Sequence, residues 1–243
     1  MEIKDKVILI TGASSGIGLA AARLLWKDGG KLALNARSKG KLDQLAGELP
    51  GSEVFPADME DEREARNLVA KVQSRFGRLD ILINNAGRGM NGPLETIDIK
   101  EYRRLIDLNI IGPLAAMQAV IPVMRKQGGG AIVNISSGTT LMYAPGLSGY
   151  SATKRALNGL TLTARNELAS DHITVSVVYP YVTKSNFFEN LISSEAKRKT
   201  ADEYVAGRAP ADTPEHVAGL IKTAILTGDA EIYAHDWMKS AMR

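Results

Sequence analysis

Short apolar segments alternate with longer amphipathic segments along almost the whole chain, and this alternation constrains the fold more than any other feature. The short segments are rich in Val, Ile and Leu and have no polar face, as in Val7–Ile10. Strands of this composition are buried on both sides. A helix after each strand covers the sheet on both faces, which is the arrangement of an α/β protein with a parallel sheet.

Strands and helices are both expected at specific places from this pattern. The expected strands are Val7–Ile10, Lys31–Ala36, Val54–Phe55, Ile81–Asn84, Ala131–Ser136, Thr174–Tyr179 and Glu231–Tyr233. The expected helices are Gly16–Asp28, Lys39–Glu48, Asp61–Arg75, Ile99–Lys126, Gly149–Ala169 and Pro214–Leu226. Because crossovers between parallel strands are right-handed, the sequence predicts a Rossmann-type doubly wound parallel sheet of about seven strands with helices on both faces.

The pattern predicts one domain over all 243 residues, since neither a linker nor a repeat interrupts it. The long helix that begins at Ile99 is expected to bend at Pro113 or Pro122. Residues 181–208 break the rhythm of strands and helices, and a polar, irregular segment of this length is typical of a functional loop. We expect it to form a substrate loop or lid.

The composition excludes several kinds of site and partner. The chain has no cysteine, so it holds no disulfide and no thiolate metal site. The three histidines, His172, His216 and His235, lie far apart in the sequence, and we expect surface or capping roles and no metal. The longest apolar stretch, Ile110–Met124, is shorter than the roughly 18–20 residues of a membrane span. With a net charge of only +3, we expect no nucleic acid, no membrane and a cytoplasmic location.

A glycine-rich segment, Thr11–Gly18, joins the first expected strand to the first helix. Glycines allow a tight turn and a close approach of the backbone to a pyrophosphate, while the free amides of the helix N-terminus attract the anion. The context between a strand and a helix supports a dinucleotide site, and a glycine-rich turn without ligand is the alternative. The expected binding residues are Gly12, Ser14, Ser15, Gly16, Ile17 and Gly18.

Three motifs occur in an order that resembles the short-chain dehydrogenase/reductase (SDR) family. They are the Gly-x-x-x-Gly-x-Gly spacing of the glycine loop, Asn84–Gly87 (NNAG), and Ser137 followed by Tyr150–Lys154 (YSATK). The match covers nearly the whole chain. The resemblance implies an oxidoreductase that transfers a hydride between a nicotinamide cofactor and a carbonyl or secondary alcohol. It also implies a homo-oligomer, a dimer or tetramer paired through the two longest helices.

The end of the second strand favours NADP(H) over NAD(H). The segment Leu34–Ser38 contains no carboxylate, which NAD-binding folds use to bind the ribose 2′-OH. Ala36 leaves room there, Arg37 can form charge-assisted bonds with a 2′-phosphate, and Ser14 and Ser38 can add hydroxyl donors. The alternative is that Arg37 is a surface arginine.

The resemblance assigns further cofactor residues. It implies that Asp58 accepts a hydrogen bond from the adenine amino group beside Met59, whereas a helix N-cap is the structural alternative for Asp58. The remaining residues that it implies are Asn85, Ala86 and Gly87 along the adenosine ribose, and Pro180 with Thr183 or Ser185 near the carboxamide. Here Tyr181 replaces the glycine that the family usually has after the proline.

Tyr150 and Lys154 are spaced to lie on one face of a helix, with a rise of roughly 6 Å between them. A nearby ammonium lowers the pKa of a phenol, which can then exchange a proton with a carbonyl or alcohol oxygen. A Tyr-x-x-x-Lys pair alone is usually structural, so its meaning here depends on the other motifs. The cofactor itself would also contact Tyr150 and Lys154.

Ser136 and Ser137 end the fifth strand, and the resemblance selects Ser137 as the group that stabilises charge on the substrate oxygen. Ser136 is the alternative. Asn109 interrupts an apolar stripe; in the family this asparagine lies at a helix distortion and holds a water that leads to the lysine. A hydrogen-bonded core asparagine is the alternative reading.

Apolar residues suggest the substrate side of the site. Phe187, Phe188 and Leu191 predict an apolar lid, and Met142, Tyr143 and Leu147 could line the pocket, although the same residues could pack on the fold itself. One alternative function is a catalytically silent NADP-binding sensor or interaction protein. A variant within the class is a carrier-linked 3-oxoacyl reductase, which would need basic residues at the entrance, with Arg103, Arg104 and Lys197–Lys199 as candidates.

Overall fold

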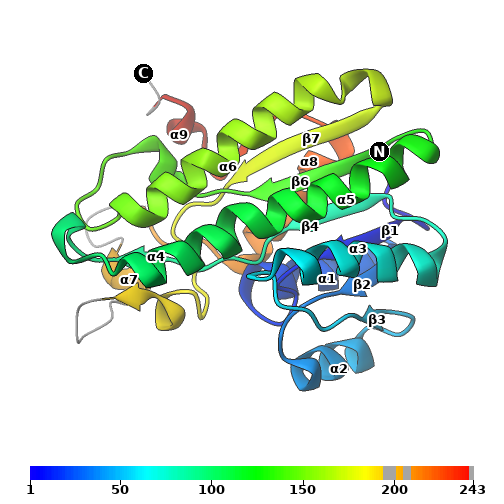
Figure 1. Ribbon diagram of the computed structural model, residues 1–243, viewed down its shortest axis with the longest axis horizontal. Coiled ribbons are helices and arrows are strands. Elements are labelled where there is room, and N and C mark those ends of the chain that lie inside the picture. Colours follow the sequence, from blue (N-terminus) through cyan, green and yellow to red (C-terminus); the bar gives the residue numbers. More distant parts are fainter. Residues whose placement is uncertain (194–200, 205–208, 241–243) are drawn as a thin grey trace.

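The computed structural model describes residues 1–193, 201–204 and 209–240. Seven parallel strands form one sheet in the order β3-β2-β1-β4-β6-β7-β9 (Figure 1). Their bounds are β1 Val7–Ile10, β2 Lys31–Leu34, β3 Glu53–Val54, β4 Ile81–Asn84, β6 Gly130–Ile135, β7 Ile173–Tyr179 and β9 Glu231–Tyr233. The predicted doubly wound sheet is confirmed. Its strand order reverses between β1 and β4, where folds of this kind bind ligands.

Helices cover both faces of the sheet. Those on the face turned toward the viewer in Figure 1 are α3 Glu62–Phe76, α5 Gly112–Lys126 and α6 Ser148–Glu167. On the opposite face lie α1 Gly16–Lys27 and α8 Pro214–Thr227, and α2 Lys39–Glu48 packs with them through Leu42 and Leu45. Shorter elements are η1 Leu94–Thr96, η3 Gly138–Leu141, η4 Ala169–Asp171, η5 Phe188–Asn190, α7 Ala201–Tyr204 and α9 Asp236–Ser240.

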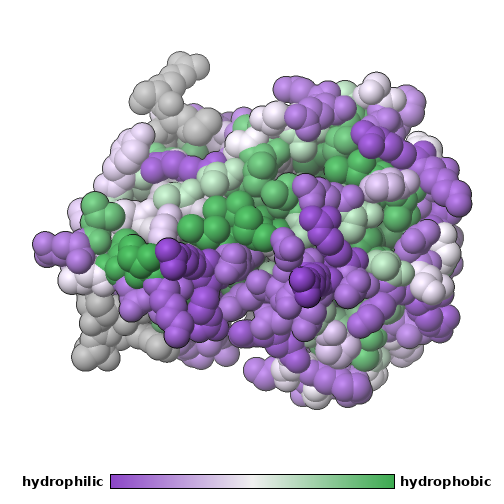
Figure 2. Space-filling view, viewed as in Figure 1, coloured by the Kyte–Doolittle hydropathy of each residue, from purple (hydrophilic) through white to green (hydrophobic). Residues whose placement is uncertain are grey.

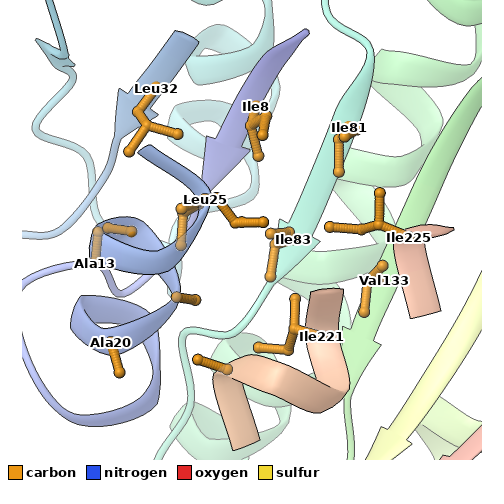
Figure 3. Packing of buried hydrophobic residues seen from close by; sticks show 14 of the residues in the cluster. Ile8, Ala13, Ala20, Leu25, Leu32, Ile81, Ile83, Val133, Ile221 and Ile225 are labelled. Atoms are coloured by element: carbon orange, nitrogen blue, oxygen red, sulfur yellow. The ribbon is translucent and has the colours of Figure 1, made fainter. Parts of the chain in front are cut away.

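The core between the sheet and α1 and α8 shows why the strands are apolar on both sides. Ile8, Ile81 and Ile83 point from β1 and β4 toward Leu25 of α1 and Ile221 of α8 (Figure 3). The alternate strand residues belong to a second core under α3 and α5. Each fully buried Leu or Ile contributes about 1.5–3 kcal/mol, so both faces hold the sheet in place.

The long helix expected over Ile99–Lys126 is interrupted. It consists of α4 Ile99–Ile106, the π-helical segment η2 Asp107–Ile111, and α5. This irregularity precedes both Pro113 and Pro122, where a bend was expected, and both prolines lie within α5. The amide of Gly112 donates to the carbonyl of Asp107, five residues earlier, which widens the helix by one residue.

By length and apolar composition, one helical stretch among the described residues, Ile99–Lys126, could span a membrane. Its residues Ala116, Val120 and Met124 are fully buried in the core with the sheet and α3. A π-helical segment also interrupts the stretch. These contacts are those of a core helix in an α/β domain.

A second, two-stranded parallel sheet was not expected from the sequence. It pairs β5 Met90–Asn91 with β8 Ile192–Ser193, and the Ile192 amide donates to the Gly89 carbonyl at 3.0 Å. The pairing holds the beginning of the predicted lid against the segment that follows β4. The rest of the predicted loop, 194–200 and 205–208, and the basic run Lys197–Lys199 lie outside the described residues.

Candidate active site

The glycine loop brings the N-terminus of α1 to the carboxyl edge of the sheet. Gly12 and Gly16 have φ angles of 69° and 53°, which favour glycine. A Cβ at Gly18 would overlap the carbonyl oxygen of Gly12 and lie 2.5 Å from Nδ2 of Asn85. Ser15 occupies the N-cap position of α1 without a side-chain cap bond. The loop is thus compact, and the helix N-terminus keeps amides for an anionic ligand.

Thr11 connects this loop to the NNAG motif, a role that the sequence reasoning missed. Its buried hydroxyl donates to the Ile83 carbonyl at 3.2 Å and accepts from the amides of Asn85 and Ala86, each at 3.0 Å. The Asn85 side-chain amide donates to the carbonyls of Thr11 and Gly12 at 2.9 and 3.3 Å. These bonds fix the ends of β1 and β4 as one unit.

A cavity of about 1090 Å³ lies along this edge of the sheet, at the upper end of the size range of small-molecule sites. It brings together most of the predicted binding and catalytic residues. Those that line it are Gly12, Ser14, Ser15, Gly16, Ile17, Arg37, Ser38, Asp58, Met59, Asn85, Ala86, Gly87, Ser137, Tyr150, Lys154, Pro180 and Thr183. Gly18 and Asn109 are not among the lining residues.

Positive charge gathers at the cavity end beyond β2. Arg37 and Lys41 both line the cavity there, and Lys41 was missed by the sequence reasoning. The Arg37 guanidinium is 63% exposed and lies 3.9 Å from the Glu60 carboxylate, which is bound more closely by Arg104 at 3.1 Å. Ser38 precedes α2 at its N-cap position and makes no side-chain cap bond. Two cations and an open helix N-terminus make this end suited to a phosphate.

Asp58 lines the same end of the cavity and does not cap the next helix. Its Oδ1 accepts from the Glu60 amide at 3.0 Å. Asp61 caps α3 instead, accepting from the amides of Arg63 and Glu64 at 2.7 and 3.2 Å. The helix-cap alternative for Asp58 is therefore wrong, and its carboxylate remains at the cavity wall.

Tyr150 and Lys154 lie on one face of α6, with exposed fractions of 7% and 4%. The Tyr150 hydroxyl is hydrogen-bonded to the side chain of Ser137, whose Oγ also accepts from the Thr139 amide at 3.2 Å. Ser136 is 3% exposed, and its Oγ has no partner among the described residues. Of the two serines, Ser137 is the one placed beside the phenol.

Burial controls the acidity of both groups. It raises the pKa of Tyr150 to about 12, against a lowering contribution from the hydrogen bond with Ser137. Burial also lowers the pKa of Lys154 to about 8. The expected lowering of the phenol pKa by the ammonium is not found in the chain alone, where burial dominates. Lys154 Nζ instead donates to the Ile135 carbonyl at 2.8 Å. The phenol is therefore held neutral, ready to donate a proton.

Asn109 is fully buried in the π-helical segment η2. Its Nδ2 donates to the Arg88 carbonyl at 2.9 Å and to Thr153 Oγ1 at 3.1 Å, and its Oδ1 accepts from the Arg88 amide at 3.1 Å. A Cβ on Gly87 would lie 3.1 Å from Asn109 Oδ1 and 3.4 Å from Lys154 Nζ. The asparagine thus has the satisfied bonds of a core residue and also lies next to the lysine.

The loop after β7 departs from the family pattern at Tyr181. This side chain is 9% exposed and lines the cavity. Its ring makes edge contacts with His235 and Trp237, at centroid distances of 5.7 and 5.4 Å. Thr183 Oγ1 donates to the Tyr181 carbonyl at 2.9 Å, and Ser185 lies over Gly16 of the glycine loop. The larger side chain thus joins the loop to the C-terminal segment.

The part of the cavity beside Tyr150 is mainly apolar. Phe187, Phe188 and Leu191 line it, and the Phe187 ring lies 5.7 Å from the Tyr150 ring. Met142 and Leu147 also line it. Tyr143 does not: it is 92% exposed and its ring lies under the Arg155 guanidinium. Trp237 and Met238 complete the wall from α9, and the sequence reasoning missed both.

Comparisons with known proteins agree with this fold. A family model described as short chain dehydrogenase matches residues 6–196. An uncharacterized oxidoreductase of Methylorubrum extorquens is 35% identical over 235 residues, 94% of this chain and 92% of that protein. The structure of a 3-ketoacyl-(acyl-carrier-protein) reductase from Brucella melitensis, solved with NADH, has 26% identity and a TM-score of 0.84, over 95% of this chain and 97% of that one. A blue fluorescent protein from a metagenomic library, solved with NADPH, has 28% identity and a TM-score of 0.84, over 96% and 97%. This chain is an oxidoreductase that belongs to the short chain dehydrogenase family.

Proposed function

We propose that the protein transfers a hydride reversibly between NADP(H) and a carbonyl or secondary-alcohol substrate, with Tyr150 as general acid and base. The observation that carries this proposal is the Tyr150 hydroxyl, hydrogen-bonded to Ser137 and buried in the wall of a cavity that continues to the open N-terminus of α1. A phenol in this position is within reach of a substrate held against the nicotinamide end of a dinucleotide.

The chain's own residues handle the proton and the developing charge. Because its pKa is raised to about 12, Tyr150 is neutral at physiological pH and can donate its proton to a carbonyl oxygen during reduction. Ser137 stabilises the negative charge that develops on that oxygen. Lys154 positions the cofactor ribose. When bound, NADP(H) supplies or accepts the hydride, and its oxidised ring adds a positive charge that favours the phenolate in the reverse direction.

Asn109 acts as a positioning residue in this proposal. Its amide ties η2 to Arg88 and Thr153 and lies beside Lys154. A proton relay from Tyr150 through Lys154 toward solvent would pass along this side of the site. The π-helical segment at Asp107–Ile111 supports the relay, because such segments occur frequently at functional sites.

The residues at the far end of the cavity favour NADP(H) over NAD(H). Arg37 and Lys41 offer positive charge there. The Ser38 side chain makes no cap hydrogen bond with α2, and the segment that ends β2 contains no acidic residue. A 2′-phosphate would satisfy these donors. The remaining cofactor contacts that we propose are Asp58 and Met59 at the adenine, Asn85–Gly87 along the ribose, Gly12–Gly18 at the pyrophosphate, and Pro180 with Thr183 at the carboxamide.

The substrate is proposed to be a small-molecule carbonyl compound with a bulky apolar group. The apolar lining includes Phe187, whose ring lies 5.7 Å from that of Tyr150, and the other apolar and aromatic residues that line the cavity are Leu191, Met142, Trp237 and Tyr181. An apolar group against this wall would gain about 25 cal/mol for each Å² removed from water. Neither Arg103 nor Arg104, the candidate entrance residues of a carrier-linked 3-oxoacyl reductase, lines the cavity.

A homo-oligomer, a dimer or tetramer, is proposed through the exposed side of the long helices. Figure 2 shows apolar surface gathered along α5, where Leu114, Ile121 and Val123 are only half-buried. Contiguous apolar surface of this kind on a soluble protein marks an interface. Light scattering of the purified chain tests this proposal, and a monomeric mass contradicts it.

The proposed reaction is tested with a panel of ketones, aldehydes and secondary alcohols, followed by the absorbance of NADPH and, in parallel, of NADH. We expect turnover of apolar carbonyl compounds with NADPH preferred. Cofactor binding without turnover of any member of a broad panel would favour a silent NADP-binding protein instead.

A further inference from the structure

The fold brings together two histidines and a carboxylate that the sequence separates. Asp212 precedes α8, His216 lies in its first turn, and His235 lies between β9 and α9. Each side chain offers one possible ligand atom, and these three atoms lie within 4.8 Å of one another. The sequence did not predict this proximity, although His216 is exposed in the first turn of α8, as expected of a surface histidine. His172, at the beginning of β7, is not in this cluster.

Backbone bonds hold each member of the cluster in place. The Asp212 amide donates to the Val182 carbonyl at 2.8 Å, and its carbonyl accepts from the Lys184 amide at 2.9 Å. The His216 amide donates to the Thr213 N-cap hydroxyl at 3.2 Å. The Ala234 amide, next to His235, donates to the Tyr179 carbonyl at 3.1 Å. The three side chains thus come from anchored segments, as a binding site requires.

One atom of the cluster lacks a partner. The Asp212 side chain is 9% exposed, and its Oδ1 lies 3.0 Å from His235 Nε2. Its Oδ2 is buried and has no hydrogen-bond partner among the described residues. Buried carboxylate oxygens are nearly always paired, so this one requires an explanation. A cation beside the two imidazoles would supply the missing partner.

We propose that Asp212, His216 and His235 bind a divalent transition-metal ion of the zinc type. Imidazole and carboxylate are ligands that Zn²⁺ accepts, at about 2.0–2.2 Å, and three protein ligands leave a further position for water. The two imidazole rings are nearly parallel, at 20°, with centroids 5.6 Å apart, and His216 Nε2 lies 3.2 Å from the Ala234 carbonyl. Because a ring nitrogen binds a metal in the plane of its ring, one of the two rings must rotate before both can reach a common ion. Each neutral imidazole binds the ion through its unprotonated nitrogen, and its other nitrogen carries the proton. The oxidation state of the ion does not change.

The site would act on the catalytic cavity through aromatic contacts. The His235 ring stacks on Trp237 at 5.8 Å and 9°, and it meets the edge of Tyr181 at 5.7 Å. Both Trp237 and Tyr181 line the cavity, so an ion that fixes His235 also fixes this wall. The ion has a structural role in this proposal, since its ligands are not placed among the reacting groups.

Metal binding is tested on the untagged full chain after treatment with a chelator, independently of any activity. Titration with Zn²⁺ in a calorimeter should show one site per chain. Titration with Co²⁺ should show visible d–d absorption and quench part of the tryptophan emission, because Trp237 lies against His235 whereas Trp26, the other tryptophan, is in α1. The Trp237→Phe variant should bind Co²⁺ with no such quenching.

His216→Ala is the decisive variant, because His216 is exposed and its ring contacts the protein through a 3.2 Å hydrogen bond with the Ala234 carbonyl. We expect it to weaken Zn²⁺ binding at least 10-fold and to abolish the rise in Tm that Zn²⁺ gives the unaltered chain. His172→Asn, at the histidine outside the cluster, is the matched control and should bind as the unaltered chain does. Absence of stoichiometric binding to the unaltered chain, or equal affinity of His216→Ala, overturns the proposal and leaves Asp212–His235 as a simple hydrogen bond. Neither result affects the proposed hydride transfer.

Discussion

The ammonium of Lys154 donates a 2.8 Å hydrogen bond to the main-chain carbonyl of Ile135, at the end of β6. Tyr150, one turn earlier on α6, is hydrogen-bonded to Ser137 instead. The lysine is thus anchored to the sheet and not to the phenol. Burial, and not mutual attraction, shifts the pKa of both groups.

Lys154→Met should change how stability depends on pH. Folding lowers the pKa of Lys154 from 10.5 to about 8, so between these values the unfolded chain holds more protons than the folded chain. The free energy of unfolding of the unaltered chain should therefore rise with pH across this window, by up to about 3 kcal/mol relative to the variant. Chemical denaturation at pH 7, 8.5 and 10 without cofactor measures this difference.

Lys71→Met is the matched control for that series, since Lys71 is an exposed residue of α3. It should leave the difference from the unaltered chain constant over the same pH range. If the curves for Lys154→Met and the unaltered chain run parallel instead, Lys154 is not a buried, proton-releasing group.

Arg37→Asp should weaken NADPH binding far more than NADH binding. Loss of a charge-assisted hydrogen bond costs about 1.5–3 kcal/mol, which is roughly 10- to 100-fold in Kd. Lys41→Ala should act in the same direction. Lys39→Ala is the control, because Lys39 pairs with Asp43 and does not line the cavity. Fluorescence titration of the three variants and the unaltered chain with both nucleotides measures these affinities. Equal losses for NADPH and NADH in Arg37→Asp would defeat the assignment of Arg37.

Gly18→Ala should abolish nucleotide binding and lower Tm. The new methyl group would overlap the Gly12 carbonyl and press on Asn85, both of which are held by further hydrogen bonds. Gly219→Ala, in α8 with nothing within 4 Å of the added Cβ, is the control. It should be neutral or stabilising by about 0.5–1 kcal/mol, as is usual for glycine in a helix. Normal nucleotide affinity of Gly18→Ala would show that the loop does not pack as described.

Trp237→Ala should raise KM for bulky apolar carbonyl compounds and leave the affinity for NADPH unchanged. Trp237 lines the cavity in edge contact with Tyr181, whereas the proposed NADPH contacts come from the glycine loop and Arg37. The measurement compares KM for a small and a bulky ketone in the variant and the unaltered chain. If the variant has the same KM as the unaltered chain for both the small and the bulky ketone, α9 does not contact the substrate.

The fold could be predicted because its signals are local. Apolar runs such as Val7–Ile10 and the glycine loop specify strands and turns within a few residues, and the boundaries differ only by one or two residues. The interruption of the long helix at η2 was not predicted. The sequence drew attention to the prolines, whereas the π-helical bond from the Gly112 amide to the Asp107 carbonyl is set by packing. A Cβ on Gly112 would overlap the Met59 carbonyl, a contact that no local pattern encodes.

Most residues of the candidate site were also found from motifs, yet three features depend on tertiary structure. Lys41 reaches the cavity through its place in the first turn of α2, and Trp237 reaches it from the other end of the chain. The raised pKa of Tyr150 follows from burial, which spacing along a helix does not reveal. The cluster of His216 and His235 forms only because β9 brings the segment of His235 next to α8.

The proton transfer assigned to Tyr150 is tested most directly by single-turnover and steady-state reduction of a substrate by the Tyr150→Phe variant with NADPH. Phenylalanine keeps the ring against Phe187 and removes only the hydroxyl. We expect NADPH to bind with unchanged affinity and turnover to fall by at least 100-fold, the lower range of general acid catalysis. Turnover close to that of the unaltered chain, with NADPH bound, would contradict the assignment of Tyr150 as the group that donates the proton.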